Sequence, residues 1–526
     1  MKINKFLIPI TLIAGLLLAG CGATTAPTYA VPEGAQAGQL DGLQPCEFQP
    51  QGRKAKFAAD CGTLIVPENW DKAESRLIPL PVVRVPASGP NPAEPVFWLV
   101  GGPGGTNLSW APPAWLLAKH DVVQVGYRGV DGSVVLACPE LGRAFDAHTG
   151  WDLESEQARA EYQAGAKKCA TDLQAQGVDL SGYAMPNVIQ DMEAARTALG
   201  YKQINLFSES YGTRLAELYA YMHPDSLHRV ILIGVNTPGH FIWSPSTIDE
   251  QIQYLSALCS RDAACSSRTP DLARTIYTVN RTMPKHWLFF NIDPATVRLG
   301  TQFMLFDKEN ITTIMDTYLA AGEGDPSGLA MDNLTMQSIK PLGHSVLGDY
   351  LNKGGTADLE RYGGLSSVSL GDSIMGAPFS ELIWPLATVW PVPLIPKELR
   401  EFQQTDVDML LINGTVDFST PPVALDEARP YFHKAQFVLL PEFSHVGDEY
   451  TLQQQAFERL ITSYYDTGRA DSSLYVYDPL SFKPGMSMTV LAKLLAAAMI
   501  VVPVLIILAV AWVVRGIQRR RTRKST

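Results

Sequence analysis

The feature that most constrains the fold is an apolar strand that runs directly into a turn of small residues and then into a helix. The segment Ile204-Asn-Leu-Phe-Ser-Glu-Ser-Tyr-Gly-Thr-Arg214 contains Ser-x-Ser-x-Gly, and a helical pattern covers Gly212–Met222. Residues on either side of the central serine must be small, because such a sharp turn brings two stretches of backbone close together. Ser208 and Gly212 meet this requirement. We therefore predict that Ser210 stands above the end of a buried strand, as a nucleophilic serine does.

Other short apolar runs have the composition of buried strands. Several are continuous and do not alternate, which is typical of strands that are buried on both faces of a parallel sheet. Helical patterns lie between them, for example at Val188–Leu199 and after Pro422. This succession predicts an α/β fold with a mostly parallel sheet flanked by helices. The predicted strands are Gly62–Val66, Leu77–Val85, Val96–Val100, Val122–Gly126, Ile204–Ser208, Val230–Gly234, Met409–Asn413 and Phe437–Leu440.

The alternation of strands and helices stops between Gly234 and about Trp384. We predict a helical lid over residues 236–385, inserted between two parts of a sheet domain at residues 45–235 and 386–466. The helix-like segments of this lid are Ile248–Cys259, Leu272–Val279 and Ile311–Ala321. Its aromatic side chains are expected to lie in a core; they are Phe241, Trp243, Trp287, Phe289 and Phe290.

A glycine-rich loop, Gly101-Gly-Pro-Gly-Gly105, follows one of the predicted strands. It could be a plain tight turn, and a phosphate loop is disfavoured because no Gly-Lys-Ser/Thr follows. Beside a nucleophilic serine, such a loop supplies one N–H to the oxyanion, and the residue after the serine supplies the other. Because Pro103 has no N–H, we predict Gly102, in preference to Gly104, as one donor and Tyr211 as the second.

An acid and a histidine follow Ser210 in the order that this chemistry requires. Folds with such a turn carry their triad in the order serine, acid, histidine. Asp417 ends a strand-and-turn run, and His445 lies in the loop after the strand Phe437–Leu440. His433 precedes that strand and would lie at the wrong end of the sheet. The sequence thus predicts a triad of Ser210, Asp417 and His445, which needs no metal or cofactor.

These motifs resemble those of the bacterial tripeptidyl aminopeptidase and proline iminopeptidase group of α/β-hydrolases. The resemblance spans about residues 41–465 and implies the α/β-hydrolase fold and an exopeptidase that releases short units from peptide N-termini. Two departures leave the substrate preference open: Val100 replaces a usual histidine, and Ile233-Gly-Val-Asn236 stands where relatives often have Asp-Gly-Val. The matching segments are Gly101-Gly-Pro-Gly-Gly, Tyr127-Arg-Gly-Val-Asp-Gly-Ser133, Ser208-Glu-Ser-Tyr-Gly-Thr-Arg214, Gly414-Thr-Val-Asp417 and Ser444-His445.

Other functions remain open. A carboxylic ester hydrolase would use the same triad, and a non-catalytic tethered binding protein would need none of it. Serine carboxypeptidases share the glycine loop, but Arg128-Gly129 and the absence of Asn at position 100 favour the aminopeptidase side. In an aminopeptidase, Glu209 is the first candidate to bind the substrate's ammonium group, although it could equally brace the turn.

Both ends of the chain carry membrane signals. Residues 1–20 have a basic start and an apolar run that ends in Leu18-Ala-Gly-Cys21, which resembles a bacterial lipobox and predicts cleavage before Cys21 and its acylation. An ordinary signal peptide is the alternative. Residues 21–44 are expected to be a flexible linker. Leu494–Val514 has no charged residue and is long enough to cross a bilayer core of ~30 Å.

Charge and cysteine content agree with this topology. The tail at residues 515–526 is basic, so the positive-inside rule predicts that it is cytoplasmic and that the body, joined to the bacterial cell membrane through a linker at 467–493, is extracytoplasmic. The net charge of −11 argues against a nucleic-acid partner. With Cys21 acylated, an even number of cysteines remains, without Cys-x-x-Cys spacing, as expected in an oxidising compartment. The simplest disulfide pairing is Cys46–Cys61, Cys138–Cys169 and Cys259–Cys265.

Overall fold

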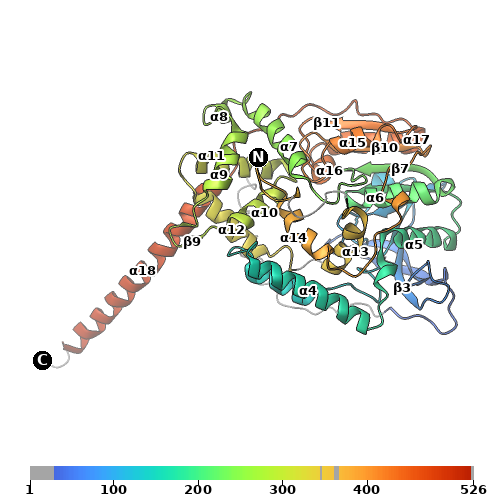
Figure 1. Cartoon of the computed structure of the whole chain (residues 1–526), viewed down its shortest axis with the longest axis horizontal. Helices are drawn as coiled ribbons and strands as arrows, with labels where there is room; N and C mark the ends of the chain where they lie inside the picture. Colours follow the sequence, from blue (N-terminus) through green and yellow to red (C-terminus); the bar gives the residue numbers. More distant parts are fainter. Residues whose placement is uncertain (1–28, 344–345, 361–366, 523–526) are drawn as a thin grey trace.

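The computed structural model describes residues 29–343, 346–360 and 367–522, so the expected signal sequence and Cys21 lie outside the described residues. One nine-stranded sheet organises the chain, in the order β1-β2-β3-β5-β4-β6-β7-β10-β11. Figure 1 shows the chain and labels β3, β7, β10 and β11 of this sheet. The strands β1, β2 and β3 are antiparallel to their neighbours, and the strands from β5 to β11 are parallel. The strands are β1 Leu40–Phe48, β2 Phe57–Pro67, β3 Leu77–Val85, β4 Ala93–Leu99, β5 His120–Val125, β6 Ile204–Glu209, β7 Leu227–Ile233, β10 Met409–Gly414 and β11 Gln436–Leu440.

All eight predicted strands are present, but β1 was not predicted. It is an edge strand with mostly exposed side chains, so it has no continuous apolar run. The predicted linker of residues 21–44 therefore ends too late in the sequence, because residues 40–44 belong to β1. A disulfide between Cys46 and Cys61 ties this edge strand to β2.

The parallel strands inside the sheet, β5, β4, β6, β7 and β10, are largely buried on both faces, which explains their continuous apolar composition. Leu206 and Leu232 point into a core that is covered by α5 (Met185–Ala198) and α6 (Tyr211–Met222). Their neighbours on the same strands point the opposite way and pack under α17. The residues on that second face include Phe207, Ile231 and Ile412 from the strands and Phe457, Leu460 and Tyr464 from α17 (Gln454–Thr467).

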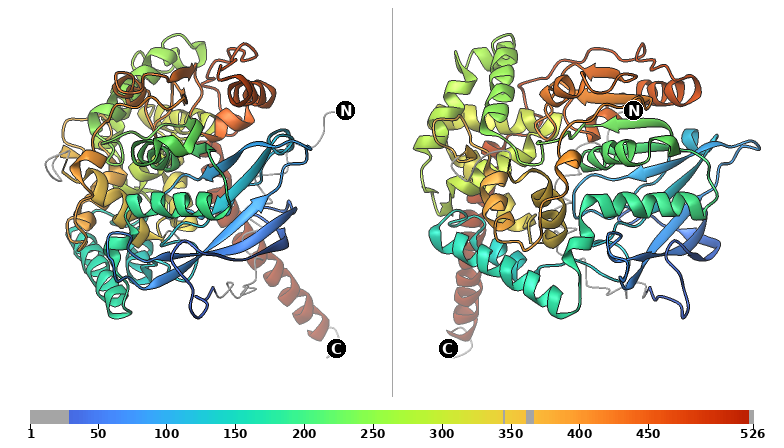
Figure 2. Two further views of the ribbon diagram at one scale, coloured as in Figure 1. Left: turned by 90° about the vertical axis from the view of Figure 1, so that its right-hand side faces the viewer. Right: turned by 45° about the vertical axis from the view of Figure 1, so that its right-hand side comes forward.

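Helices dominate the described residues between β7 and β10 and enclose a separate apolar core. Figure 2 shows this lid beside the sheet domain. The helices α3 (Pro139–His148) and α4 (Glu156–Ala175), which precede β6 in the chain, share a further core with α13 and α14. The lid elements are α7 Pro245–Cys259, α8 Ala263–Ser266, α9 Leu272–Thr282, β8 His286–Trp287, β9 Phe290–Asn291, α10 Pro294–Met304, α11 Lys308–Gly322, α12 Ser327–Ile339, α13 Leu347–Asp358 and α14 Pro378–Ala387.

All three predicted disulfides are confirmed. Besides the bond in the edge strands, Cys138 pairs with Cys169 and joins α3 to α4. Cys259 pairs with Cys265 and joins α7 to α8. Each of these bonds therefore links elements that are neighbours in the chain.

The last helix, α18 (Met488–Thr522), is long and apolar enough over Met488–Arg519 to cross a membrane. Its first turns pack against α11 and α12 of the lid, and the rest projects away from the body (Figure 1). The segment before α18, predicted as a linker at residues 467–493, packs on the body, because Leu480 and Phe482 are buried in the lid core.

A buried arginine connects the loop after β5 to the antiparallel edge of the sheet. Arg128 donates from Nε to Asp191 of α5 at 2.6 Å, and the two side chains also share a second hydrogen bond. Its Nη1 donates to the carbonyl oxygens of Glu68 and Gly182 at 2.6 Å each. This fully buried pair explains why Arg128 appears in the Tyr127-Arg-Gly segment: it anchors the loop.

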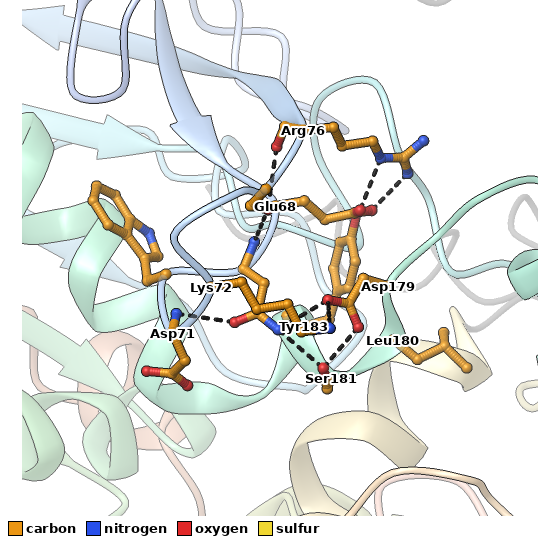
Figure 3. Close-up of polar contacts among 12 residues, drawn as sticks. Glu68, Asp71, Lys72, Arg76, Asp179, Leu180, Ser181 and Tyr183 are labelled. Carbon is orange, nitrogen blue, oxygen red and sulfur yellow. Dashed lines mark hydrogen bonds and ion pairs between the residues drawn. The ribbon is translucent and has the colours of Figure 1, made fainter.

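The segment after β2 is held in turn by polar contacts with the short 3-10 helix before α5 (Figure 3). Arg76 and the hydroxyl of Tyr183 both donate to the carboxylate of Glu68. Lys72, in the same segment after β2, forms an ion pair with Asp179, which directly precedes the 3-10 helix. The carbonyl oxygens that receive Arg128 are thereby kept in place.

We predict that Asp191→Asn destabilises the protein by about 3–5 kcal/mol, because it leaves the buried charge of Arg128 without its partner. The control is Asp172→Asn, which removes an exposed pair with Lys168 and should leave stability unchanged within error. Denaturant unfolding of the detergent-solubilised chain measures both. Equal effects of the two substitutions would contradict the assigned role of Arg128.

Candidate active site

Ser210 lies at the sharp turn between β6 and α6, as predicted. Its backbone has φ 50° and ψ −121°, a region that side-chain-bearing residues rarely occupy. The turn is possible because its neighbours are small: a Cβ on Gly212 would lie 2.1 Å from the carbonyl oxygen of Leu99. Ser208 is buried and donates to the carbonyl oxygen of Ile231 at 2.7 Å. The strained position raises Ser210 above the end of the sheet.

Asp417 and His445 come together beyond the ends of β10 and β11. His445 Nδ1 lies 2.8 Å from Asp417 Oδ2. The buried Asp417 also accepts hydrogen bonds from the backbone N–H groups of Ser419 and Thr420, at 2.8 Å each. The hydroxyl of Thr420 donates to the same carboxylate at 2.7 Å and lies 3.2 Å from His445 Nδ1. Thr420 was not singled out in the sequence, because no motif marks it.

The imidazole of His445 is confined by a glycine and by the lid. A Cβ on Gly234, whose φ is +61°, would lie 2.8 Å from the ring. Phe306 of the lid accepts the backbone N–H of His445 at 3.3 Å, and the two rings lie 5.9 Å apart. Asp448 accepts the backbone N–H of Ser444 at 3.0 Å and fixes the preceding residue. The histidine loop is therefore held from both the sheet and the lid.

Ser210 and His445 line one cavity of about 330 Å³. Its walls are mainly apolar, with aromatic side chains from the lid, and among the described residues they include no carboxylate. Phe241 and Trp243, which were expected to be core residues only, form part of this wall. Within the described part of the chain, no three His, Cys, Asp or Glu side chains gather as metal ligands. The aromatic lining consists of Phe241, Trp243, Phe303, Phe306, Tyr350 and Phe379.

The glycine loop reaches the same cavity through Gly102 and Pro103. The N–H of Gly104 donates to Asp349 Oδ2 at 2.9 Å, so it is already used. This leaves Gly102 as the better candidate for an oxyanion donor from this loop. Tyr211 follows Ser210 at the start of α6, where its N–H has no earlier carbonyl in the helix to bind.

Asp349, on helix α13 of the lid, helps to hold the glycine loop in place. Its carboxylate pairs with Lys353 at 2.6 Å, and both side chains are fully buried. Lys353 also donates to the carbonyl oxygen of Arg128 at 3.1 Å. Burial raises the pKa of Asp349, although Lys353 acts in the opposite direction. The lid is thus bound to the glycine loop and to the loop after β5.

Glu209 does not line the cavity that holds Ser210. It lines a second cavity of about 790 Å³ with Trp110 and Tyr450, on the other side of the turn. Burial raises the pKa of its carboxyl group, which outweighs the opposing effects of Tyr450, His445 and the backbone of Gly101. This placement favours the alternative in which Glu209 braces the turn over the one in which it binds a substrate amine.

Comparison with known proteins agrees with this architecture. A family model described as the alpha/beta hydrolase fold matches residues 94–258, which include the glycine loop and the turn at Ser210. The chain has the α/β-hydrolase fold. Among solved structures, a serine hydrolase from Cycloclasticus zankles is similar with 12% identity and a TM-score of 0.35; the match covers 82% of this chain and 100% of that chain.

Curated relatives are similar over part of this chain. A tripeptidyl aminopeptidase of Streptomyces coelicolor is 26% identical over 209 residues, which is 37% of this chain and 38% of the relative. The serine protease Hip1 of Mycobacterium tuberculosis is 27% identical over 244 residues, which is 43% of this chain and 45% of the relative. The chain thus matches less than half the length of these relatives.

We predict that the hydrogen bond from Gly104 to Asp349 controls the reactivity of Ser210. Two double variants share Lys353→Met, so that no lysine is left unpaired, and differ only at Asp349. The variant with Asp349→Asn keeps an acceptor for Gly104, whereas Asp349→Ala has none. Fluorophosphonate labelling should be about ten to a hundred times slower in the alanine variant than in the asparagine variant. This decrease is smaller than the decrease in rate that follows the loss of one oxyanion donor. Equal labelling rates would show that the loop does not depend on Asp349.

Proposed function

We propose that this chain is a membrane-anchored serine hydrolase whose catalytic triad is Ser210, His445 and Asp417. The observation that carries the proposal is the hydrogen bond of His445 to a buried, multiply hydrogen-bonded Asp417, beside a cavity that His445 shares with Ser210. The strained backbone of Ser210 supports it, since strain is typically retained where function requires it. The order of the three residues in the chain is that of the fold.

In the proposed mechanism, Ser210 Oγ attacks a carbonyl carbon while His445 Nε2 accepts its proton. Asp417 holds the Nδ1–H of His445 and stabilises the imidazolium that forms. The N–H groups of Gly102 and Tyr211 bind the oxyanion of the tetrahedral intermediate. His445 then donates the proton to the leaving group, whose bond to the carbonyl carbon breaks. Water next attacks the acyl-enzyme while His445 accepts its proton, and His445 donates that proton to Ser210 Oγ as the acyl bond breaks.

Ser210→Ala should abolish turnover and fluorophosphonate labelling, with a loss on the order of 10⁶-fold if the triad acts as a unit. The matched control is Ser208→Ala, two residues earlier in the same turn, which removes only a buried hydroxyl and should keep labelling. The folded state of each variant is checked by circular dichroism. Labelling that persists in Ser210→Ala, or that is lost only in Ser208→Ala, would refute the assignment.

For the substrate, we propose peptides that are cut near a free N-terminus. The support is the resemblance to a tripeptidyl aminopeptidase, together with an aromatic cavity that suits apolar side chains next to the scissile bond. The lid closes over the Ser210 cavity with Phe303, Phe306 and Phe379, as an exopeptidase needs in order to accept only a chain end.

A second candidate is a carboxylic ester hydrolase with the same triad. It is favoured by the absence of a carboxylate among the described residues that line the Ser210 cavity. A substrate ammonium group buried without an anionic partner would cost several kcal/mol, whereas an ester carries no such charge. Glu209, the carboxylate nearest to Ser210 in the chain, lines the other cavity.

Paired peptides distinguish the two candidates. If the enzyme is an aminopeptidase, N-acetylated peptides should be cut at least tenfold more slowly than free ones, because the acetyl group removes the charge that the site must recognise. The purified chain is incubated with both sets and products are identified by mass spectrometry. Equal rates on both, with faster hydrolysis of matched esters, would favour the ester hydrolase; cleavage from the C-terminal end would favour a carboxypeptidase.

We also propose how the chain is placed at the membrane. The apolar part of α18 spans the bacterial cell membrane, with the basic tail of residues 515–526 in the cytoplasm and the body outside. Acylation of Cys21 would add a second attachment. The three disulfides support an oxidising location for the body.

A further inference from the structure

The lid carries a short hairpin, β8–β9, whose tip exposes two large apolar side chains. Leu288 is 63% exposed and Phe289 is 53% exposed. Leu288 also has φ +52°, a backbone conformation that a leucine rarely adopts. Phe289 was expected to lie in the lid core, but the structure places it at the surface. The hairpin that carries this pair lies against α18, many of whose apolar side chains are also exposed, and adjoining exposed apolar surface is typical of an interaction site.

The base of the same hairpin is bound to the start of α18. Trp287 and Phe290 stack with ring centroids 5.8 Å apart. Both lie around one small space together with Ala492 and Leu495 of α18. Figure 1 shows β9 beside α18 at the place where this helix leaves the body. The position of the tip relative to α18 is therefore fixed by packing.

The contact falls at the boundary between the covered and the exposed parts of α18. Ala492 is buried, and Lys493 is paired with Asp325 of the lid. Ala496 is also buried, whereas the large apolar side chains from Met499 to Ile517 are exposed. If α18 crosses a bilayer, this change from covered to exposed marks the level at which hydrocarbon begins. The hairpin lies at that level, where aromatic side chains are favoured at membrane surfaces.

We propose that Leu288 and Phe289 insert into the phospholipid interface beside α18 and give the lid a second contact with the membrane. The inference rests on the proposed membrane crossing by α18. The exposed Lys285 and His286 stand just before the tip, at the height where lipid phosphates would lie. Two contacts, the helix and the hairpin, would prevent the body from rotating about α18. The lid, which supplies most of the wall of the Ser210 cavity, would then face the bilayer surface.

Site-specific photocrosslinking tests this contact in the full-length chain. A photoreactive benzoyl-phenylalanine replaces Phe289, and the protein is reconstituted in vesicles of phosphatidylcholine and phosphatidylglycerol that carry a clickable acyl chain. Leu505, which is exposed in the middle of α18, serves as the positive control. Leu439, which is exposed on β11 of the sheet domain, serves as the negative control.

We expect lipid adducts at positions 289 and 505, with a yield at 289 several times that at 439. Lipid adducts at 505 without any at 289 would overturn the hairpin contact and leave the membrane anchor intact. Crosslinks from 289 to a second copy of the chain would also overturn it, in favour of a dimer surface. An absence of lipid adducts at both 289 and 505 would reject the membrane anchor itself.

Discussion

The candidate site depends on the close approach of two backbone segments at the ends of β4 and β6. Gly212 leaves no room for a side chain against the carbonyl oxygen of Leu99, and a Cβ on Gly101 would lie 3.0 Å from the Cβ of Ser210. This contact is possible because β4 and β6 are adjacent parallel strands that end at the same edge. The serine and the glycine loop are therefore placed side by side by the sheet itself.

The lid covers the candidate site and also holds two of its loops in place. Asp349 of α13 accepts a hydrogen bond from the glycine loop, and Phe306 accepts one from the backbone of His445. The buried pair of Asp349 and Lys353 must stay intact, because an isolated charge at that depth is costly. A lid held in this way, which also packs on α18 through α11 and α12, links that helix to the site through packed helices.

Local patterns were sufficient to predict the turn at Ser210, the strands of the main sheet other than β1, the order of Asp417 and His445, and the disulfides. Each depends on residues close together in the chain or on a fixed order along it. Features that depend on tertiary packing were not predicted: the edge strand β1, the hydroxyl of Thr420 beside Asp417, and the role of Asp349. The position of Glu209 also depends on tertiary packing. The sequence places Glu209 next to Ser210, but it does not show that the two residues line different cavities.

Mapping a covalent adduct shows whether Ser210 is the nucleophile of this chain. The full-length protein is treated with a fluorophosphonate, digested, and the modified peptide is located by mass spectrometry. We expect a single adduct on Ser210, which is lost when the protein is unfolded before treatment. An adduct on Ser208 or on Ser419, which also lines the cavity, or no adduct at all on the folded protein, would contradict this assignment.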